Sequence, residues 1–234
     1  MNSEVQFLFR QRTDVGKAAF HAQLRTAVAR AQAARAASEW AALMPADALT
    51  ALPHVAETGG GGGADAIVTV SAPRETLTRA IAAIVSNLRD AANLSDSTVM
   101  AGHRHSILPG SNRIRLFFGL RRLERLSRAE FLDYWLNVHA QFGRRLIPPY
   151  SYHQIHARAG LTDESALLTG VSPSALDGIV EVHFPDLNAL IAQLMRADVA
   201  VEALADERNF IDHARSAFHV YQSAPEPADS TQSR

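Results

Sequence analysis

The residue of this chain that is best suited by type and position to transfer a proton is a histidine on an apolar helical stripe. Between residues 127 and 142, aromatic and apolar side chains recur with the period of an α-helix, and one stripe contains Phe131, Tyr134, Trp135, Val138, His139 and Phe142. Burial disfavours the imidazolium, so a neutral ring on this face can accept a proton near neutral pH. The pattern indicates a general acid or base at His139, with a core histidine bonded to a backbone carbonyl as the alternative.

A capping box fixes where this helix begins. Ser127 and Glu130 have the required spacing, because the hydroxyl can accept from a backbone N–H of the first turn while the carboxylate reaches back to the cap. We therefore predict a helix that starts at residue 128 and carries His139 about three turns further on.

More titratable side chains alternate along predicted strands of the same region. Alternation places residues two apart on one face of a strand. The side chains concerned are Tyr152, Gln154 and His156 on one strand, Glu181 and His183 on the next, and His219 and Tyr221 on the last. The sequence leaves open which strand faces meet the helix, so only some of these residues can share a pocket with His139.

The elements that position these residues belong to a repeat. The segment 65–73 returns 112 positions later as 177–185, with five of nine residues identical. Each copy reads as β-α-β-β-α-β, the ferredoxin-like order, an α+β arrangement. We expect two domains, over residues 1–108 and 113–222, and a disordered tail over residues 223–234.

Two details of the first copy are predicted from the alignment of the copies. Its second strand is expected near residues 49–55 and its last strand over residues 97–102, and residues 102–112 are expected to join the copies.

Comparison of the copies predicts that the second one carries the site. Aligning Phe20 with Phe131 places Val28 opposite His139, so packing alone does not require the histidine. In the same way, Glu181 stands opposite Thr69 in the first copy. The second copy has gained titratable groups at positions where the first has small or neutral ones.

Composition excludes several classes of function. The net charge of −1 and pI near 6.8 give no general attraction to nucleic acid or to anionic membranes. The absence of cysteine excludes disulfides, thiolate nucleophiles and cysteine-ligated metals. No apolar run is long enough to span a membrane, and the N-terminus has no apolar signal region, so a cytoplasmic location is expected.

Four consecutive motifs carry a resemblance to a known family. Residues 134–140 (YWLNVHA), 152–156 (YHQIH), 177–181 (DGIVE) and 206–212 (DERNFID) follow one another in the order seen in the EthD family, and the chain resembles an EthD domain from about residue 113 to 221. The resemblance implies a dimeric α+β barrel, built here within one chain as an internal pseudo-dimer, with a further homodimer left open. It also implies that His139 and His156 correspond to histidines of the family.

The leading hypothesis is a cofactor-free enzyme that moves protons on a small cyclic, lactone or aromatic substrate, in isomerisation, dehydration or decarboxylation. His139 is the expected base or acid, and His156 with Tyr134 or Tyr152 is the expected partner. The candidate substrate contacts are Trp135, Phe142, Phe117, Glu181 and His183. The alternatives are an oxidative enzyme, either a cofactor-free monooxygenase or a haem protein, and a non-catalytic ligand-binding protein. No metal is expected.

Overall fold

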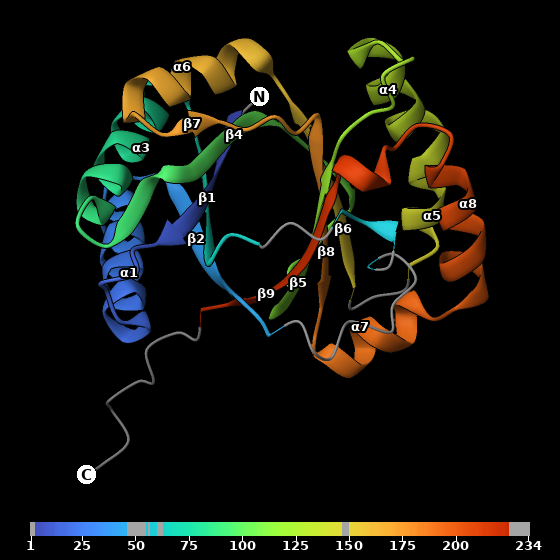
Figure 1. The fold of residues 1–234 in the computed structure, drawn as a ribbon, viewed down its shortest axis with the longest axis horizontal. Coiled ribbons are helices and arrows are strands. Elements are labelled where there is room, and N and C mark those ends of the chain that lie inside the picture. The colour runs from blue at the N-terminus through green and yellow to red at the C-terminus, as the bar shows by residue number, and fades with distance from the viewer. Residues whose placement is uncertain (1–2, 46–54, 56, 60–62, 147–149, 225–234) are drawn as a thin grey trace.

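The protein is a ring of strands with helices stacked against it on two opposite sides (Figure 1). The computed structural model describes the chain except for residues 1–2, 46–54, 56, 60–62, 147–149 and 225–234. The tail expected over residues 223–234 lies outside the described residues from residue 225 onward.

The first half has the element order β-α-β-β-α-β. Its elements are β1 (Ser3–Gln11), α1 (Lys17–Ala33), β2 (Ala37–Leu43), β3 (Ala66–Ala72), α3 (Arg74–Leu88) and β4 (Ala92–Leu108). Helix α3 forms because its apolar residues recur at helical spacing, and it buries Leu77, Ile81, Ile84 and Leu88 on one face. These side chains pack with those of α1 against one face of the sheet.

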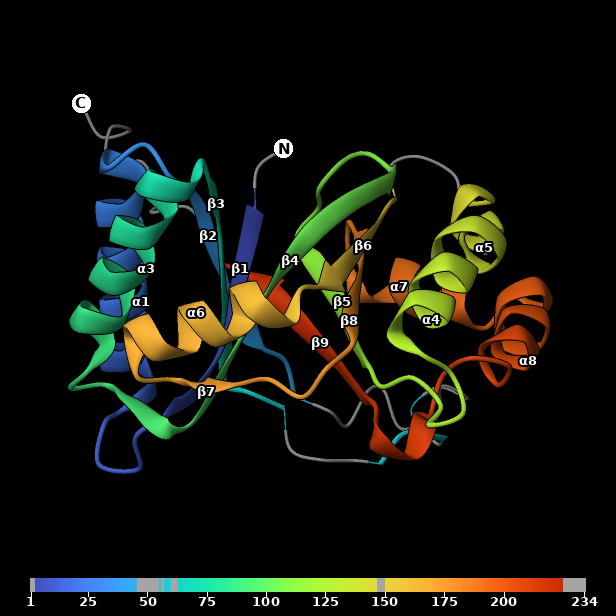
Figure 2. The same ribbon diagram turned by 90° about the horizontal axis from the view of Figure 1, so that it is seen from above.

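The second half repeats this order with extra helical turns. Its elements are β5 (Ile114–Leu120), α4 (Arg128–Tyr134), the π-helical segment η2 (Trp135–His139), α5 (Ala140–Arg144), β6 (Ser151–Ala157), α6 (Ala159–Thr169), β7 (Ser172–Pro173), β8 (Gly178–Phe184), α7 (Leu187–Leu194), the π-helical segment η3 (Asp198–Ala203), α8 (Leu204–Glu207), the short 3₁₀ turn η4 (His213–Arg215) and β9 (Ala217–Ser223). The connection between β6 and β8 crosses to the first half, where α6 packs against α3 and β7 pairs with β4 (Figure 2).

The strands of both halves close into one barrel. Among the described residues, eight strands pair antiparallel in the order β1-β3-β2-β9-β5-β8-β6-β4, and β4 pairs back to β1. Short β7 adds to β4 outside this ring. Closure leaves no long unpaired edge, which removes a route to aggregation. The two copies of the repeated segment lie in β3 and β8, which is the third barrel strand of each half when short β7 is left aside.

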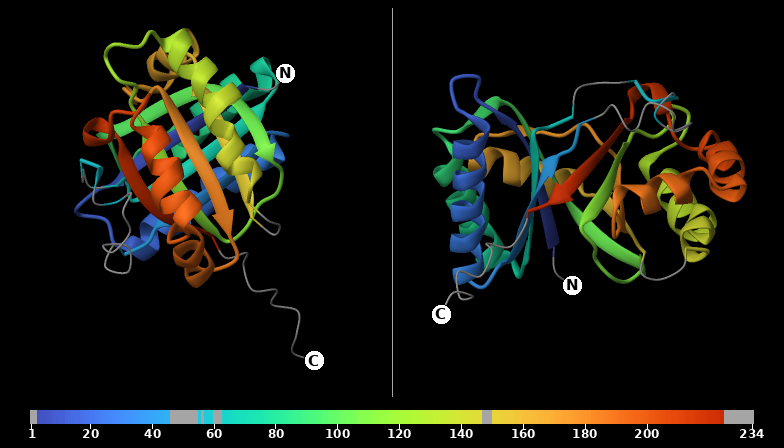
Figure 3. Two further views of the ribbon diagram at one scale, coloured as in Figure 1. Left: turned by 90° about the vertical axis from the view of Figure 1, so that its right-hand side faces the viewer. Right: turned by 90° about the horizontal axis from the view of Figure 1, so that it is seen from below.

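The alternation of side chains along each strand separates the barrel interior from two helix-covered outer faces. One apolar cluster lies under α1 and α3, and a second lies between the helices of the second half and strands β5, β6, β8 and β9. A third, which includes Ile67, Met100, Phe117 and Tyr221, lies inside the barrel. Figure 3 shows the two helical layers on either side of the strands. Each side chain on a barrel strand therefore points either into the barrel interior or outward to the helices.

The expected second strand of the first half is wrong in position. Strand β2 occupies residues 37–43 rather than 49–55, and residues 49–54 lie outside the described residues. Helix α1 ends in a tight reversal at Arg35, whose φ of 64° is left-handed, and the strand follows at once. Ser38 and Trp40 are buried while Ala37 and Glu39 are exposed, so buried and exposed side chains do alternate along β2. The alternating stretch is short, which makes it a weak strand signal in the sequence.

The segment expected to join the copies, residues 102–112, is wrong over residues 102–108, and residues 109–112 do lie between β4 and β5. Residues 102–108 continue strand β4, which runs without interruption from Ala92 to Leu108. The strand is long because it has two barrel partners: Ala92, Asn93 and residues 98–102 pair with β1, and residues 102–106 and 108 pair with β6. One end of β4 thus belongs to each half, and the strand closes the barrel between them.

Candidate active site

The helix that carries the candidate histidine begins as the sequence predicts. Ser127 Oγ accepts from the Glu130 backbone N–H at 3.2 Å, and Glu130 Oε2 accepts from the Ser127 N–H at 2.8 Å, so the capping box is confirmed. After about two turns the helix becomes π-helical in η2, which ends at His139. Phe131, Trp135 and His139 are buried, but Val138 is 41% exposed, contrary to its place on the expected stripe. The wider π turn shifts the phase of the stripe after Trp135.

His139 forms a dyad with a carboxylate from another helix. Its Nδ1 lies 2.7 Å from Asp206 Oδ2, and the Tyr134 hydroxyl donates to Asp206 Oδ1 at 2.6 Å. An ionised carboxylate only accepts, so Nδ1 carries the proton and Nε2 is the basic nitrogen. The bond from His139 is the main reason why the pKa of Asp206 lies below its ordinary value, and the same carboxylate raises the pKa of Tyr134. Asp206 thereby fixes the tautomer and orientation of the ring.

A pocket lies between the outer face of the sheet and the helices, and His139 lines it. The opposite wall is apolar and comes from four strands, with Phe118 on β5, Tyr152 on β6, Val180 on β8 and Phe218 on β9. The space between its walls, counted together with the open mouth, is about 620 Å³. The enclosed cavity has a volume of about 80 Å³. The narrow cavity is smaller than the ~150 Å³ that accommodates benzene in an engineered protein, so a ring-shaped ligand requires outward movement of the helices.

Buried polar groups at this pocket come from β6 and from the helices. Gln193 and Glu207 line it, and Glu207 Oε2 lies 2.9 Å from His213 Nε2. The Tyr152 hydroxyl accepts from Gln154 Nε2 at 3.1 Å. Burial raises the pKa of Tyr152 to about 12, so at neutral pH this phenol is a hydrogen-bond donor and not a base.

His156 does not line this pocket. Its ring stacks on Trp135 with centroids 4.7 Å apart, and its Nε2 lies 3.0 Å from Gln154 Oε1. Burial lowers the pKa of His156 to about 3, so the ring is neutral and donates to Gln154. Gln154 in turn donates to the backbone oxygen of Trp135 at 3.0 Å. In this geometry His156 orients Gln154, and it reaches the pocket only through that amide and Tyr152.

The aromatic candidates divide in the same way. Phe142 lines the pocket, and its ring centroid lies 5.3 Å from that of His139. Trp135 is fully buried beneath the helix and packs on Phe131 rather than facing the pocket. Phe117 points to the other face of β5, into the barrel interior, where it meets Tyr221 edge-on at 5.8 Å.

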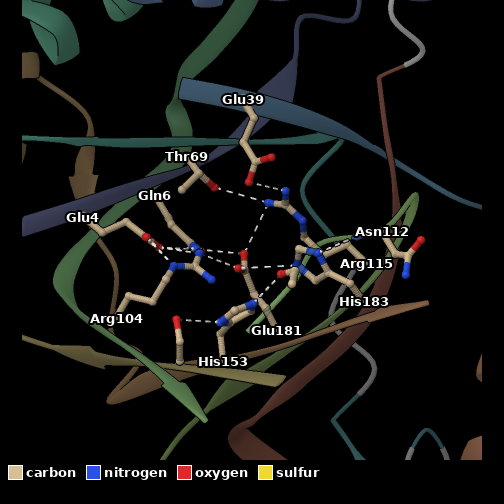
Figure 4. A network of polar contacts seen from close by, with 12 residues as sticks. Glu4, Gln6, Glu39, Thr69, Arg104, Asn112, Arg115, His153, Glu181 and His183 are labelled. Carbon is tan, nitrogen blue, oxygen red and sulfur yellow. Dashed lines mark hydrogen bonds and ion pairs between the residues drawn. The ribbon is translucent and has the colours of Figure 1, made fainter. Parts of the chain in front are cut away.

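Glu181 and His183 also lie inside the barrel, on the face of β8 opposite to the pocket (Figure 4). Val180 and Val182 alternate with them and face the helices, so the structure does not bring Glu181, His183 or Phe117 into contact with the His139 pocket. The period of two along a strand sets this separation.

Glu181 is the centre of a buried ion network that links the two halves. Its carboxylate accepts from Arg104 Nη2 at 2.6 Å, Gln6 Nε2 at 2.9 Å and Arg115 Nη1 at 3.3 Å. Arg104 also binds Glu4, at 2.6 Å. Burial alone raises the pKa of Glu181, but Arg115 and Arg104 outweigh it and hold that pKa well below its usual range. The pKa of Glu4, by contrast, is raised chiefly by burial.

Sequence reasoning missed Asp206, Glu207 and Arg104 as functional or structural groups. Asp206 and Glu207 stood in the 206–212 motif that carried the resemblance, which was the available signal. Arg104 lay in the segment interpreted as a joining loop, where a strand face was not considered. Its neighbours His103 and His105 belong to no group of three or more His, Asp or Glu side chains placed to bind a metal ion among the described residues.

The lining of the pocket does not meet the requirements of a haem group. A porphyrin needs a broad slot and cations near its two carboxylates. The described lining contains Glu207 and neither Lys nor Arg, and the cavity volume is about 80 Å³. The residues present therefore do not fit haem in this conformation.

The fold and this helix-borne site define the class as an α+β protein with a closed antiparallel barrel. Residues 123–214 match the model of the EthD domain, which covers the helix of His139 and the carboxylate of Asp206. A comparison with curated protein sequences gives no match.

Solved structures with the same fold span nearly the whole chain. One is a proposed monooxygenase from Fusobacterium nucleatum, with a TM-score of 0.59, 8% identity and coverage of 96% of this chain and 92% of that one. Another is a proposed monooxygenase from Lactobacillus acidophilus, with a TM-score of 0.57, 8% identity and coverage of 95% of this chain and 94% of that one. A cyanide complex of a chlorite dismutase variant from Candidatus Nitrospira defluvii has a TM-score of 0.52, 12% identity and coverage of 96% of this chain and 91% of that one. At these identities the likeness concerns the fold alone.

No helix in the described part of the chain combines the length and apolar character needed to cross a membrane.

Proposed function

We propose that this protein is an enzyme that abstracts and returns a proton on a small cyclic organic substrate, with His139 as the base and then the acid. The observation that carries the proposal is the 2.7 Å contact between His139 Nδ1 and Asp206, which leaves Nε2 as the basic atom of a ring that lines an apolar pocket. Such acid–base assistance is typically worth about 10²–10⁴-fold.

The surrounding residues support an enolate or phenolate intermediate. The buried Tyr152 phenol, whose pKa is raised, stays protonated and serves as donor to the developing oxyanion. The apolar wall of Phe118, Val180 and Phe218 excludes water and accommodates a ring. The reaction class is isomerisation, dehydration or decarboxylation of a lactone or aromatic ketone, with no cofactor.

A second candidate is a cofactor-free monooxygenase that uses the same first step. The observation that favours it is the shared fold with two proposed monooxygenases. Deprotonation of an electron-rich phenol by His139 would give the anion that reacts with O₂. The two candidates share the proton transfer and differ only in the fate of the anion.

The two halves are, in this proposal, tandem ferredoxin-like domains over residues 1–108 and 113–222 that form the barrel as an internal pseudo-dimer. The repeated segment in β3 and β8 and the shared β-α-β-β-α-β core of the two halves, to which the second half adds α6, β7 and further helical turns, support this interpretation. The first half carries Val28 in place of the histidine, so one active site per chain is expected.

The test is hydrogen exchange in D₂O on a panel of unsaturated five-membered lactones and hydroxylated aryl ketones, with mass spectrometry as the readout. Wild-type protein should catalyse deuterium incorporation or turnover of at least one member, and His139→Gln should reduce the rate by about 10²-fold. His105→Gln, a histidine outside the pocket, is the matched control and should keep full activity.

Oxygen uptake separates the two candidates, because only the monooxygenase consumes O₂. A His139→Gln variant that retains the wild-type rate on a turned-over substrate would refute both. Titration with haemin gives a further check: a Soret shift that His139→Gln abolishes would contradict the cofactor-free mechanism and the fit argument above.

A further inference from the structure

A second pocket opens at one end of the barrel, on the opposite face of the sheet from His139. Both halves contribute to it, and its described lining includes Leu8 and Arg10 of β1, Phe117 of β5, and His219 and Tyr221 of β9. Phe118 and Phe218, next along the same strands, face the His139 pocket. The β5 and β9 strands thus separate two distinct spaces. The end pocket has a cavity volume of about 300 Å³, larger than that of the His139 pocket.

The floor of this pocket is apolar. Phe117 and Tyr221 are almost fully buried in the interior cluster, and Leu8 and Leu176 pack against it. The aromatic rings of Phe117 and Tyr221 meet edge-on at 5.8 Å. A flat apolar body, such as an aromatic ring, fits this floor.

The rim is basic. Arg10, Arg121 and Arg215 line the pocket, with Asp96 as the carboxylate among its described lining residues. Arg215 is bound by Asp212 at 2.6 Å and Glu124 at 3.1 Å. Arg10 donates to the Gly63 backbone oxygen.

Arg121 is the least satisfied of these groups. Its guanidinium reaches Asp177 only at 3.7 Å, and that carboxylate is shared with Arg122 at 3.5 Å and Arg128 at 3.2 Å. Three guanidinium groups thus face one carboxylate. The Nε atoms of Arg121 and Arg122 are both buried without a hydrogen-bond partner, since each lies beyond hydrogen-bond distance of Asp177. Because one carboxylate faces three guanidinium groups, an incoming carboxylate at Arg121, the one of the three that lines the pocket, would balance excess positive charge.

We propose that this end pocket binds an organic carboxylate with an aromatic or similarly flat apolar body, and that Arg121 receives the carboxylate. The ring lies on Phe117 and Tyr221, and the carboxylate meets the guanidinium at the rim. The site is separate from the His139 pocket and does not depend on the function proposed for it.

Calorimetric titration of the full chain with benzoate tests this site, with benzyl alcohol and inorganic phosphate as probes that lack the charge or the ring. Benzoate should bind saturably with a Kd of about 1 mM or tighter, and each control probe should bind at least about tenfold more weakly. Arg121→Met should weaken benzoate binding by about tenfold or more. Arg122→Met is the matched control: it removes a neighbour that shares Asp177 but does not line the pocket, so the affinity should stay within about twofold.

A second variant keeps all charges and fills the space. Ala217 lines the pocket and is half-buried, so Ala217→Leu should also weaken benzoate binding while leaving the ion pairs intact. If Arg121→Met does not fold, the benzoate affinity of Ala217→Leu tests the proposed site in its place. Absence of saturable benzoate binding overturns the proposal. So does equal weakening by Arg121→Met and Arg122→Met, or binding that Ala217→Leu leaves unchanged but His139→Gln abolishes.

Discussion

Removing the charge of Glu181 is the sharpest test of how the two halves hold together. Glu181 of the second half is fully buried and binds Arg104 and Gln6 of the first half and Arg115 of its own. Glu181→Gln keeps the shape of the side chain but leaves Arg115, 1% exposed, with Glu39 as its remaining carboxylate partner. Breaking a buried ion pair by removing one partner costs about 3–5 kcal/mol.

The assay is urea denaturation, with thermal unfolding as a second measure. For a domain of this size, such a loss corresponds to a decrease in Tm of about 6–20 °C. Glu39→Gln is the matched control, because Glu39 binds the same arginine but is half exposed. It should cost no more than about 1 kcal/mol.

The pH dependence has a defined sign. The pKa of Glu181 is lowered on folding, so its stabilisation is present above the ordinary carboxyl value of 4.5 and is lost as the pH falls through the folded value. Wild-type stability should therefore fall below pH 4.5 more steeply than that of Glu181→Gln. If Glu181→Gln unfolds within about 1 kcal/mol of wild type, the network does not hold the barrel closed and the reasoning is refuted.

Three further predictions concern the dyad, a buried histidine and a close backbone contact. Asp206→Asn should lower kcat/KM by about 10–100-fold, the value of one charge-assisted hydrogen bond, and Tyr134→Phe should lower it less; equal rates for wild type and Asp206→Asn would exclude an orienting role. Because the pKa of His156 falls to about 3 on folding, this histidine should cost wild type about 1–2 kcal/mol of stability between pH 6.5 and pH 5 by chemical denaturation, and His156→Gln should lose less by that amount over the same window; parallel curves would contradict the shift. Gly102→Ala places a methyl group 2.2 Å from the His156 backbone oxygen and should destabilise by about 1–3 kcal/mol, whereas Gly160→Ala meets nothing within 4 Å and should be neutral or slightly stabilising; similar melting temperatures for the two variants would disprove the contact.

The sequence by itself determined the local features of this protein. The capping box at Ser127 depends on residues three apart, and the helical stripe that carries His139 depends on residues within four turns, so both are readable without tertiary contacts. The repeated segment also indicated equivalent strands in the two halves, and the structure places it in β3 and β8.

Only the tertiary structure decided which polar residues act together. Asp206 is 67 residues from His139, and no local pattern pairs them. Alternation along β8 puts Glu181 and Val180 on different faces, but only closure of the barrel turns Glu181 inward to arginines of both halves and Val180 outward to the pocket. Likewise, β4 became one long strand because β6 of the other half pairs with its end. These outcomes depend on which strands become neighbours, and strand pairing across the barrel is set by contacts distant in the chain.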